Sequence, residues 1–227
     1  MKLSLIIPAL NEAHIINSAI DSIFRQKHGA DIEIIVVDGD PSKSTLNAIR
    51  DTRVMKISSP PGRGLQMNKG AMAAQGDILL FLHSDTILPQ NGISKVINTL
   101  KDKRLSGGAF DLSISARGLC FRIIEKTASL RSRFTRIPYG DQGIFIRKIF
   151  FSKIDGYKEI PIMEDVELMG RVKKKKGKIK FLNPGVSTSP RRWQKEGIIY
   201  CTIRNRVLLI LYYMGVSPFI LGRFYRP

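Results

Sequence analysis

Short apolar runs alternate with segments of helical periodicity along the first part of the chain. The runs are too short for core helices, so they predict buried strands at residues 3–8, 32–37, 54–57 and 78–82. Apolar positions at helical spacing predict helices at residues 15–24 behind an Asn11 cap, 44–51, 64–75 closed by Gly76, and 89–101. This alternation predicts right-handed βαβ units, and therefore one α/β domain with a mainly parallel sheet flanked by helices.

Polar side chains gather in the four loops that follow these strands. In an open parallel sheet, ligands bind outside the carboxyl ends of the strands, where such loops meet the N-termini of helices. The polar residues of these loops are Asn11, Glu12, Asp38, Asp40, Arg63, His83 and Asp85. The sequence therefore predicts a ligand site at this edge of the sheet.

Length and composition limit the class of protein that this chain can be. The chain has 227 residues, which suits one compact domain, and 43% of them are hydrophobic, which can fill a core. The two cysteines form no Cys-x-x-Cys pair, which argues against a disulfide framework and against a thiolate zinc site. The first residues lack a small-residue cleavage site, so we expect no signal peptide and a cytoplasmic location.

Positive charge is concentrated near the end of the chain. The formal net charge is +18, and residues 171–227 hold 14 basic residues and one acid. Such a segment is expected to meet anionic partners, namely phospholipid head groups, nucleotide phosphates or nucleic acid. Nucleic acid is the weaker expectation, because it calls for exposed aromatic residues interleaved with basic ones, and the aromatic residues here lie mostly in an apolar stretch.

That apolar stretch, residues 207–222, carries no charge and is flanked by arginines. It is too short to span a bilayer. Three interpretations stay open: it packs on its own domain, contacts a second copy in a homodimer, or lies on anionic lipid at the inner face of the cell membrane. We favour peripheral membrane contact because the flanking charge is so one-sided.

Several familiar catalytic strings are absent. The Gly62-Arg63-Gly64 segment lacks the third glycine of a dinucleotide-binding loop, and neither Gly-Lys-Ser/Thr nor Gly-x-Ser-x-Gly occurs. The histidines have no metal-ligand spacing. Hydride transfer, ATP hydrolysis and serine hydrolysis are therefore not expected, and what remains is a set of strand-end carboxylates together with Arg63.

Three acidic residues, at two places in the chain, suggest specific chemistry. Asp85 follows directly on a buried strand, where it could bind a hard cation such as Mg²⁺ or Mn²⁺ if substrate phosphates supply the other oxygens, or could simply cap the next element. Glu164 and Asp165 precede a helix that continues to about residue 175. They are either ordinary first-turn acids or a pair in which one carboxylate accepts a proton from a hydroxyl.

Four strings in order along the chain resemble family 2 glycosyltransferases with the GT-A fold. They are residues 4–12 (SLIIPALNE), residues 34–38 (IIVVD), residues 76–85 (GDILLFLHSD) and the Glu164-Asp165 pair. The sequence is most similar to small bacterial members whose metal motif reads His-Ser-Asp. The resemblance implies a GT-A nucleotide-diphospho-sugar transferase domain over residues 1–193, followed by a basic, amphipathic helical tail over residues 194–227.

The resemblance also implies roles for individual residues. Asp165 would be the general base of an inverting displacement, with Glu164 beside it, and Asp85 would bind the divalent cation. The residues implied to bind the nucleotide-sugar donor are Pro8, Ala9, Asn11, Glu12, Asp38, Arg63, His83, Asp141, Gln142, Arg191, Arg192 and Trp193. The acceptor would be a hydroxyl compound, and a lipid-linked one would fit a membrane location.

Two departures from the family pattern leave an alternative open. His83 stands where the family's metal motif has its first acid, and it adds no negative charge to a cation site. The Asp38-Gly39-Asp40 string also spells Asp-x-Asp, but we assign the metal to Asp85 on the later strand. A nucleotide-sugar-binding protein without catalytic activity is therefore the alternative to a transferase, ahead of a basic nucleic-acid-binding protein.

Overall fold

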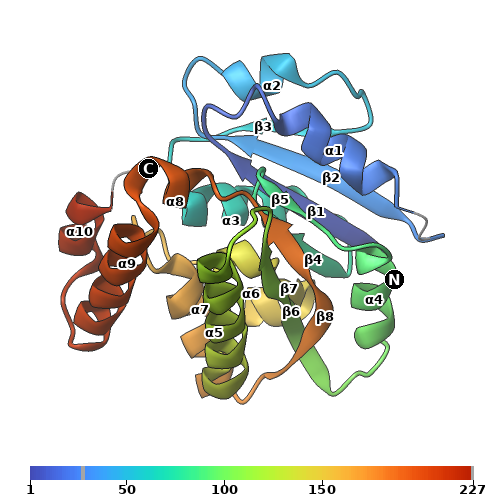
Figure 1. Ribbon diagram of the computed structural model, residues 1–227. Helices are drawn as coiled ribbons and strands as arrows, with labels where there is room; N and C mark the ends of the chain where they lie inside the picture. The colour runs from blue at the N-terminus through green and yellow to red at the C-terminus, as the bar shows by residue number, and fades with distance from the viewer. Residues whose placement is uncertain (27–28, 226–227) are drawn as a thin grey trace.

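The computed structural model describes residues 1–26 and 29–225, and in them one curled eight-stranded sheet carries helices on both faces (Figure 1). The strand order is β3-β2-β1-β4-β7-β6-β8-β5. The strands are β1 (Leu3–Ala9), β2 (Ile32–Asp38), β3 (Met55–Ser58), β4 (Ile78–Phe81), β5 (Thr86–Ile87), β6 (Leu105–Ile114), β7 (Phe145–Arg147) and β8 (Lys178–Thr188). The strands predicted in the first part of the chain are confirmed to within one residue at each end.

The helices fall into a first group between the parallel strands and a second group later in the chain. The first group is α1 (Ile16–Phe24), α2 (Ser44–Ala48), α3 (Arg63–Ala73) and α4 (Gly92–Thr99). The second is α5 (Leu119–Thr135), η1 (Gly140–Gln142), α6 (Lys148–Lys153), α7 (Glu164–Lys174), α8 (Arg191–Glu196), α9 (Ile198–Tyr213), α10 (Pro218–Leu221) and η2 (Gly222–Phe224).

The sheet is parallel in its first half and mixed in its second. Strands β3, β2, β1 and β4 are all parallel to their neighbours, as the βαβ pattern predicts. Strand β7 is antiparallel to both β4 and β6, while β6 and β8 are parallel again. The α/β class is confirmed, and the reversal at β7 separates the two halves of the molecule.

Both faces of the sheet are buried, which is why β1 is an unbroken apolar run. Successive side chains of a strand point to opposite faces, so Leu5 and Ile7 join the core beneath α1 and α4, whereas Ile6 joins the core beneath α3 and α7. All seven residues of β1 are buried. This strand therefore holds the loop that follows it at a fixed place on the sheet edge.

The helices predicted at 44–51 and 89–101 are shorter, Ser44–Ala48 and Gly92–Thr99, and two predicted helix caps were wrong. Asn11 does not cap α1, which begins after Ile15; Asn11 instead adopts a left-handed conformation (φ 58°) in the turn after β1, a conformation that asparagine tolerates better than most residues. Gly76 does not close α3, which ends at Ala73. A side chain at Gly76 would come within 2.5 Å of the Ser4 hydroxyl, so the glycine serves close packing against β1.

The end of the chain packs on the domain through one face of a helical hairpin. Helices α9 and α10 bury Leu208 and Leu221 against Ile162, and Met163 and Tyr225 complete this small cluster. The predicted helical tail thus meets its own domain, and many of its other apolar side chains, such as Ile203, Ile210 and Phe219, stay exposed. Within the described residues, no helix has the length and apolar character needed to cross a membrane.

Candidate active site

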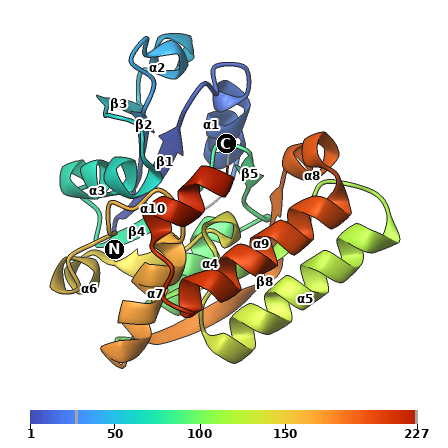
Figure 2. The ribbon, with the colours of Figure 1, turned by 90° about the vertical axis from the view of Figure 1, so that its left-hand side faces the viewer.

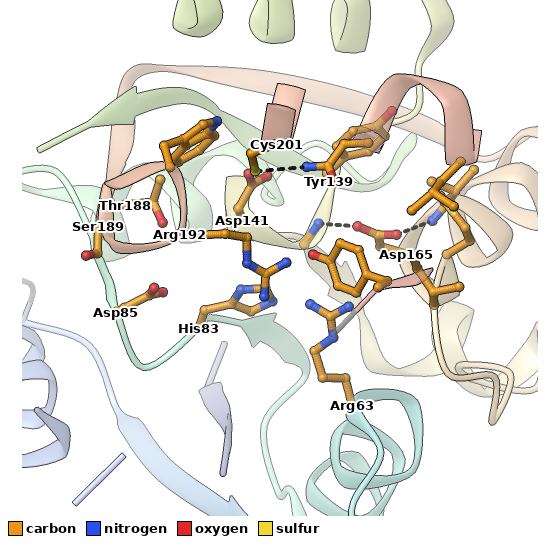
Figure 3. A pocket seen from close by; sticks show the side chains of 18 residues that line it. Arg63, His83, Asp85, Tyr139, Asp141, Asp165, Thr188, Ser189, Arg192 and Cys201 are labelled. Atoms are coloured by element: carbon orange, nitrogen blue, oxygen red, sulfur yellow. Dashed lines mark hydrogen bonds between the residues drawn. The ribbon is translucent and has the colours of Figure 1, made fainter. Parts of the chain in front are cut away.

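A cavity of about 190 Å³ lies where the loop after β4, the η1 turn and the first turn of α7 face helices α8 and α9 (Figure 3). Three carboxylates line it: Asp85, Asp141 and Asp165. Three basic side chains, Arg63, His83 and Arg192, line it as well, and Figure 3 shows their ends converging. The structure therefore brings together six of the polar residues proposed from the sequence.

Asp165 is held rigidly at the start of α7. Its Oδ2 atom accepts a hydrogen bond from the Gly140 amide at 2.6 Å, and its Oδ1 atom accepts one from the Val166 amide at 2.7 Å. Amides at a helix N-terminus favour a negative charge there. Each oxygen keeps a further lone pair, so the carboxylate can still accept a proton on the cavity side.

Asp141 is a buried acid with an oxygen left over. No described residue donates a hydrogen bond to its buried Oδ1 atom. Burial raises the pKa of Asp141 to about 6, the nearby Asp165 and Asp85 add to this rise, and Arg131 and Arg63 oppose it. A carboxylate in this situation is suited to accept a hydrogen bond from a ligand that enters the cavity.

His83 is an uncharged imidazole at neutral pH. Burial, reinforced by Arg63, lowers the pKa of His83 to about 4. A side chain at position 140 would approach the His83 Nε2 atom to 2.9 Å, so Gly140 allows this close contact. His83 can therefore donate or accept a hydrogen bond in the cavity without adding charge.

Arg63 is positioned by Glu164, the neighbour of the proposed base. The Arg63 Nε atom lies 2.7 Å from the Glu164 Oε1 atom. Glu164 is buried, its pKa is raised by that burial, and it does not itself line the cavity. The sequence paired Glu164 with Asp165 as catalytic acids, whereas the geometry pairs it with the arginine.

Arg192 reaches the cavity from α8 and lies over the Tyr225 ring, 4.6 Å from its centroid. Burial lowers the pKa of Arg192, and the positive charge of Arg63 lowers it further. The positively charged guanidinium groups of Arg63 and Arg192 repel each other in one cavity, so an anion bound between them would be stabilised. Trp193 lies beside them and packs edge-on against Phe121, with the ring centroids 6.3 Å apart.

Arg191 lies just outside the cavity and connects it to the N-terminal loop. Its guanidinium contacts both carboxylate oxygens of Glu12, at 2.8 and 3.1 Å, and lies 3.7 Å from Asp85. Asn11 occupies the same loop. The pairing joins residues from opposite ends of the chain, which sequence spacing alone does not predict.

Besides Glu164, Arg191 and the Asn11-Glu12 loop, four further residues proposed from the sequence do not line the cavity. Pro8 and Ala9 belong to β1, where the Ala9 carbonyl accepts hydrogen bonds from Gly39 and Gln66. Asp38 is fully buried, and its two oxygens accept from the amides of Asp40, Thr45 and Leu46. Gln142 is fully buried and bonds Ser132, Tyr139 and Phe110. The polar atoms of Asp38 and Gln142 stabilise their own surroundings.

Other lining residues carry no motif and were missed. Tyr139 lies under the Arg131 guanidinium, 3.3 Å from it, and burial raises the pKa of Tyr139 to about 12. Cys201, Asn205 and Leu208 come from the inner face of α9. In the sequence, only their helical spacing within a partly apolar stretch could have indicated these residues. That spacing predicts a helix but not the surface on which the helix packs.

The donor set fits a cation that arrives with phosphate oxygens. Among residues 1–26 and 29–225, no cluster of three His, Cys, Asp or Glu side chains is arranged to hold a metal by itself. Asp85 lines the cavity with a partly exposed carboxylate. Because Mg²⁺ is commonly bound by one or two carboxylates together with substrate phosphates, a single acid at this position is compatible with such an ion.

A family model described as Glycosyl transferase family 2 matches residues 4–155. A glucosyl-3-phosphoglycerate synthase from Mycobacterium tuberculosis is 34% identical over 96 residues, which make up 38% of this chain and 30% of that protein. The chain spans about a third of the length of the first curated relatives that it matches.

Solved structures of low sequence identity share the fold. Residues 1–349 of S. aureus TarS superpose with a TM-score of 0.65 at 18% identity, covering 84% of this chain and 61% of that one. The mannosyltransferase PcManGT from Pyrobaculum calidifontis, solved with GDP-Man and Mn²⁺, has a TM-score of 0.64 at 17% identity, covering 82% and 56%. Both likenesses identify a GT-A-type fold.

Proposed function

The chain belongs to glycosyl transferase family 2, and from this premise we propose that it transfers a sugar from a nucleoside-diphosphate sugar to a hydroxyl acceptor with inversion at the anomeric carbon. The observation that carries this proposal is the position of Asp165. Its carboxylate is fixed by the Gly140 amide at 2.6 Å and lines the same cavity as Arg63, Arg192 and Asp85. A proton acceptor and an anion-binding group therefore share one enclosed space.

Asp165 serves as the general base in this proposal. It takes the proton from the acceptor hydroxyl while that oxygen attacks the anomeric carbon and the nucleoside diphosphate leaves. Base catalysis of this kind contributes about 10²–10⁴-fold to the rate. The rest of the acceleration comes from positioning both substrates and stabilising developing charge.

Arg63 and Arg192 bind the diphosphate in this proposal. Their mutual repulsion in the free cavity is relieved when an anion lies between them. Glu164 acts by fixing the orientation of Arg63 rather than by proton transfer. Asp85 would hold a divalent cation together with the diphosphate oxygens, and the chemistry supplied there is neutralisation of charge on the leaving group. The GDP-Man and Mn²⁺ in the PcManGT structure support a cation of this kind.

Asp141 binds the sugar in this proposal. Its Oδ1 atom lacks a hydrogen-bond donor among the described residues, and sugar hydroxyls are donors. The neutral His83 next to Gly140 offers a further donor or acceptor to the phosphates or the ribose. Arg191 and Glu12 would close the nucleotide side of the site through their contact beside Asp85.

Calorimetry and donor hydrolysis with a panel of UDP- and GDP-sugars test the proposal. We expect at least one donor to bind more tightly with Mn²⁺ than with a chelator, and to be hydrolysed slowly in the absence of an acceptor. The variant Asp85→Ala should lose the Mn²⁺ dependence, whereas Asp155→Ala, at a left-handed turn outside the cavity, should keep it. Binding without turnover would support an inactive nucleotide-sugar binder, and no binding of any donor would overturn the proposal.

A further inference from the structure

Helices α5 and α9 carry exposed apolar stripes with the same spacing. On α5 the stripe is Leu119, Ile123, Leu130 and Phe134, and on α9 and its C-cap it is Ile199, Ile203, Ile210 and Met214, so both follow i, i+4, i+11, i+15. These eight side chains are between 53% and 90% exposed. Each stripe lies opposite the face that its helix packs on the domain, which includes Phe121 on α5 and Leu208 on α9.

The two stripes belong to one side of the molecule. Figures 1 and 2 both show α5 and α9 side by side, with α10 next to α9. Beyond α9, the exposed side chains of Phe219, Ile220 and Phe224 extend the apolar area. Between α9 and η2 this side is hollowed into an open, mainly apolar groove lined by Ile203, Val207 and Phe224. We call the exposed apolar side chains of α5, α9, α10 and η2 the apolar face.

Basic residues surround the apolar face. The segments that form or adjoin it, residues 115–136 and 191–225, contain 12 Lys and Arg residues and two acids, Glu125 and Glu196; two of the 12, Arg191 and Arg192, are directed to Glu12 and to the cavity. Both acids are already paired, Glu125 with Arg122 at 3.0 Å and Glu196 with Arg204 at 2.7 Å. Lys126 and Arg206 are exposed within the two stripes, at i+7 from Leu119 and Ile199, and Arg117 and Arg223 are exposed beside them. Arg133 is exposed as well but is paired with Asp111 at 2.7 Å. The field of this side of the molecule is therefore strongly positive.

We propose that the apolar face docks on the surface of an anionic lipid membrane, with the stripes of α5 and α9 lying in the plane of the interface. A helix with an apolar outer side and basic flanks is the pattern that interfacial segments show. The stripes supply apolar area to bury among the acyl chains, and each basic residue near the surface adds attraction to anionic head groups.

Other occupants fit the face less well. A second copy of the chain would bring two strongly positive surfaces together, which is unfavourable. A nucleic acid would match the charge but would leave Ile, Leu and Met side chains buried against phosphates, where they gain little. A lipid surface is the partner that complements both the charge and the apolar stripes.

Helix α9 connects this face to the cavity. Its outer side carries Ile203 and Ile210, while Cys201, Asn205 and Leu208 on its inner side line the cavity. A docked protein would thus hold one wall of the cavity next to the lipid head groups. The docking proposal does not rest on the transfer reaction, because lipid binding can be measured without any sugar donor.

The natural cysteines offer a direct probe. Cys120 is exposed next to Leu119 on α5, and Cys201 is buried. A thiol-reactive NBD fluorophore will therefore label the folded protein at Cys120. We expect its emission to increase and shift to the blue with vesicles of phosphatidylglycerol and phosphatidylcholine, to change little with phosphatidylcholine alone, and to lose part of the response in high salt.

Single charged substitutions test which side of the molecule binds. Leu130→Asp and Ile203→Asp should each weaken vesicle binding by about tenfold or more, because each removes an apolar anchor and adds a negative charge. Ile149→Asp is the matched control, since Ile149 is 80% exposed on α6, outside the apolar face. Its binding should equal that of the unaltered protein, and circular dichroism should show all three variants folded.

Three outcomes would overturn the proposal. The first is negligible binding to anionic and neutral vesicles alike, measured by flotation of the unlabelled protein. The second is equal binding by Leu130→Asp, Ile203→Asp and Ile149→Asp. The third is a stable dimer in sedimentation experiments in which Cys120 is protected from the label, which would identify the occupant as a second copy of this chain.

Discussion

Two acidic regions look alike in the sequence and differ in the structure. At the end of β2, the Asp38 carboxylate accepts hydrogen bonds from three amides of the loop that follows, and in that loop Asp40 accepts from the hydroxyls of Ser42 and Ser44. Around the cavity, Asp141 keeps an oxygen without a donor among the described residues, and Asp165 accepts only amide hydrogen bonds from the protein. An acid at a strand end can thus stabilise its own loop or face a ligand.

The difference follows from what comes after each acid. Asp40 is followed at i+2 and i+4 by serines, whose hydroxyls lower the pKa of Asp40 to about 2. Such local donors satisfy a carboxylate before any ligand can. Asp141 and Asp165 lie far apart in the chain and meet only when η1 packs against α7, so no local donor satisfies them fully.

The largest effect is expected at Asp165. Asparagine keeps one oxygen to accept from the Gly140 amide and turns its amino group towards the Val166 amide. It cannot act as the base, so Asp165→Asn should reduce sugar transfer by about 10²–10⁴-fold. Binding of the nucleotide alone, measured by calorimetry, should stay within about twofold of the unaltered protein, because the diphosphate-binding arginines are untouched.

Asp21→Asn is the matched control, because Asp21 is exposed on α1 and remote from the cavity. It should leave transfer unchanged. If Asp165→Asn turned over as fast as this control, Asp165 would not be the base.

A second, smaller effect is expected at Asp38, and it should appear in stability. Asparagine at this position turns an amino group towards backbone amides that need an acceptor, so Asp38→Asn should lower the free energy of unfolding by about 2–4 kcal/mol. Urea unfolding followed by circular dichroism measures this change. Transfer per folded molecule should change little.

Asp31→Asn, at an exposed position just before β2, provides the control and should leave the urea midpoint unchanged. An unaltered midpoint in Asp38→Asn together with lost nucleotide affinity would contradict the structural role. That result would assign Asp38 to the base or ribose, as the family resemblance implies.

Much of the first half of the molecule could be predicted from the sequence, since its strands are local apolar runs and its loops follow from the βαβ order. Asp85 and Asp165 were both predicted for the site, and both line the cavity. The contribution of Tyr139 could not be predicted, because its ring is held beneath Arg131 of α5. The contribution of Asn205 could not be predicted either, because it depends on how α9 packs on the domain. That packing is set by contacts such as Leu208 with Ile162, which no local pattern encodes.

The same limit explains the misplaced roles. Glu164 and Asp165 are neighbours in the chain, but the first turn of α7 points one towards Arg63 and the other towards Gly140. Gln142 lies beside Asp141 and is nevertheless fully buried with its amide satisfied. Adjacent positions on a helical turn face different surroundings, and only the tertiary structure decides which of them reaches a ligand.

The smallest of the three effects is expected at Asp141, and it should appear in how the free energy of unfolding depends on pH. Burial raises the pKa of Asp141 from 3.8 to about 6. The folded state therefore binds this proton more tightly than the unfolded state, so the stability contributed by the protonated acid is lost as the pH rises through about 6. Asp141→Asn removes that loss and should raise the free energy of unfolding by about 1–3 kcal/mol at about pH 8.

The gain should shrink steadily as the pH is lowered through about 6 towards about 4, because the natural residue then becomes protonated and uncharged as well. Urea unfolding of the unaltered protein and of Asp141→Asn, in chelator-treated buffer, measures this gain in the free energy of unfolding. Taking the difference between the two proteins cancels the opposite titration of His83, whose pKa is lowered by burial to about 4. A gain that is the same at every pH would mean that the substitution improves packing instead of removing a buried charge. A loss of stability at about pH 8 would mean that Asp141 is satisfied within the protein as Asp38 is, and that the two acidic regions do not differ in the way proposed.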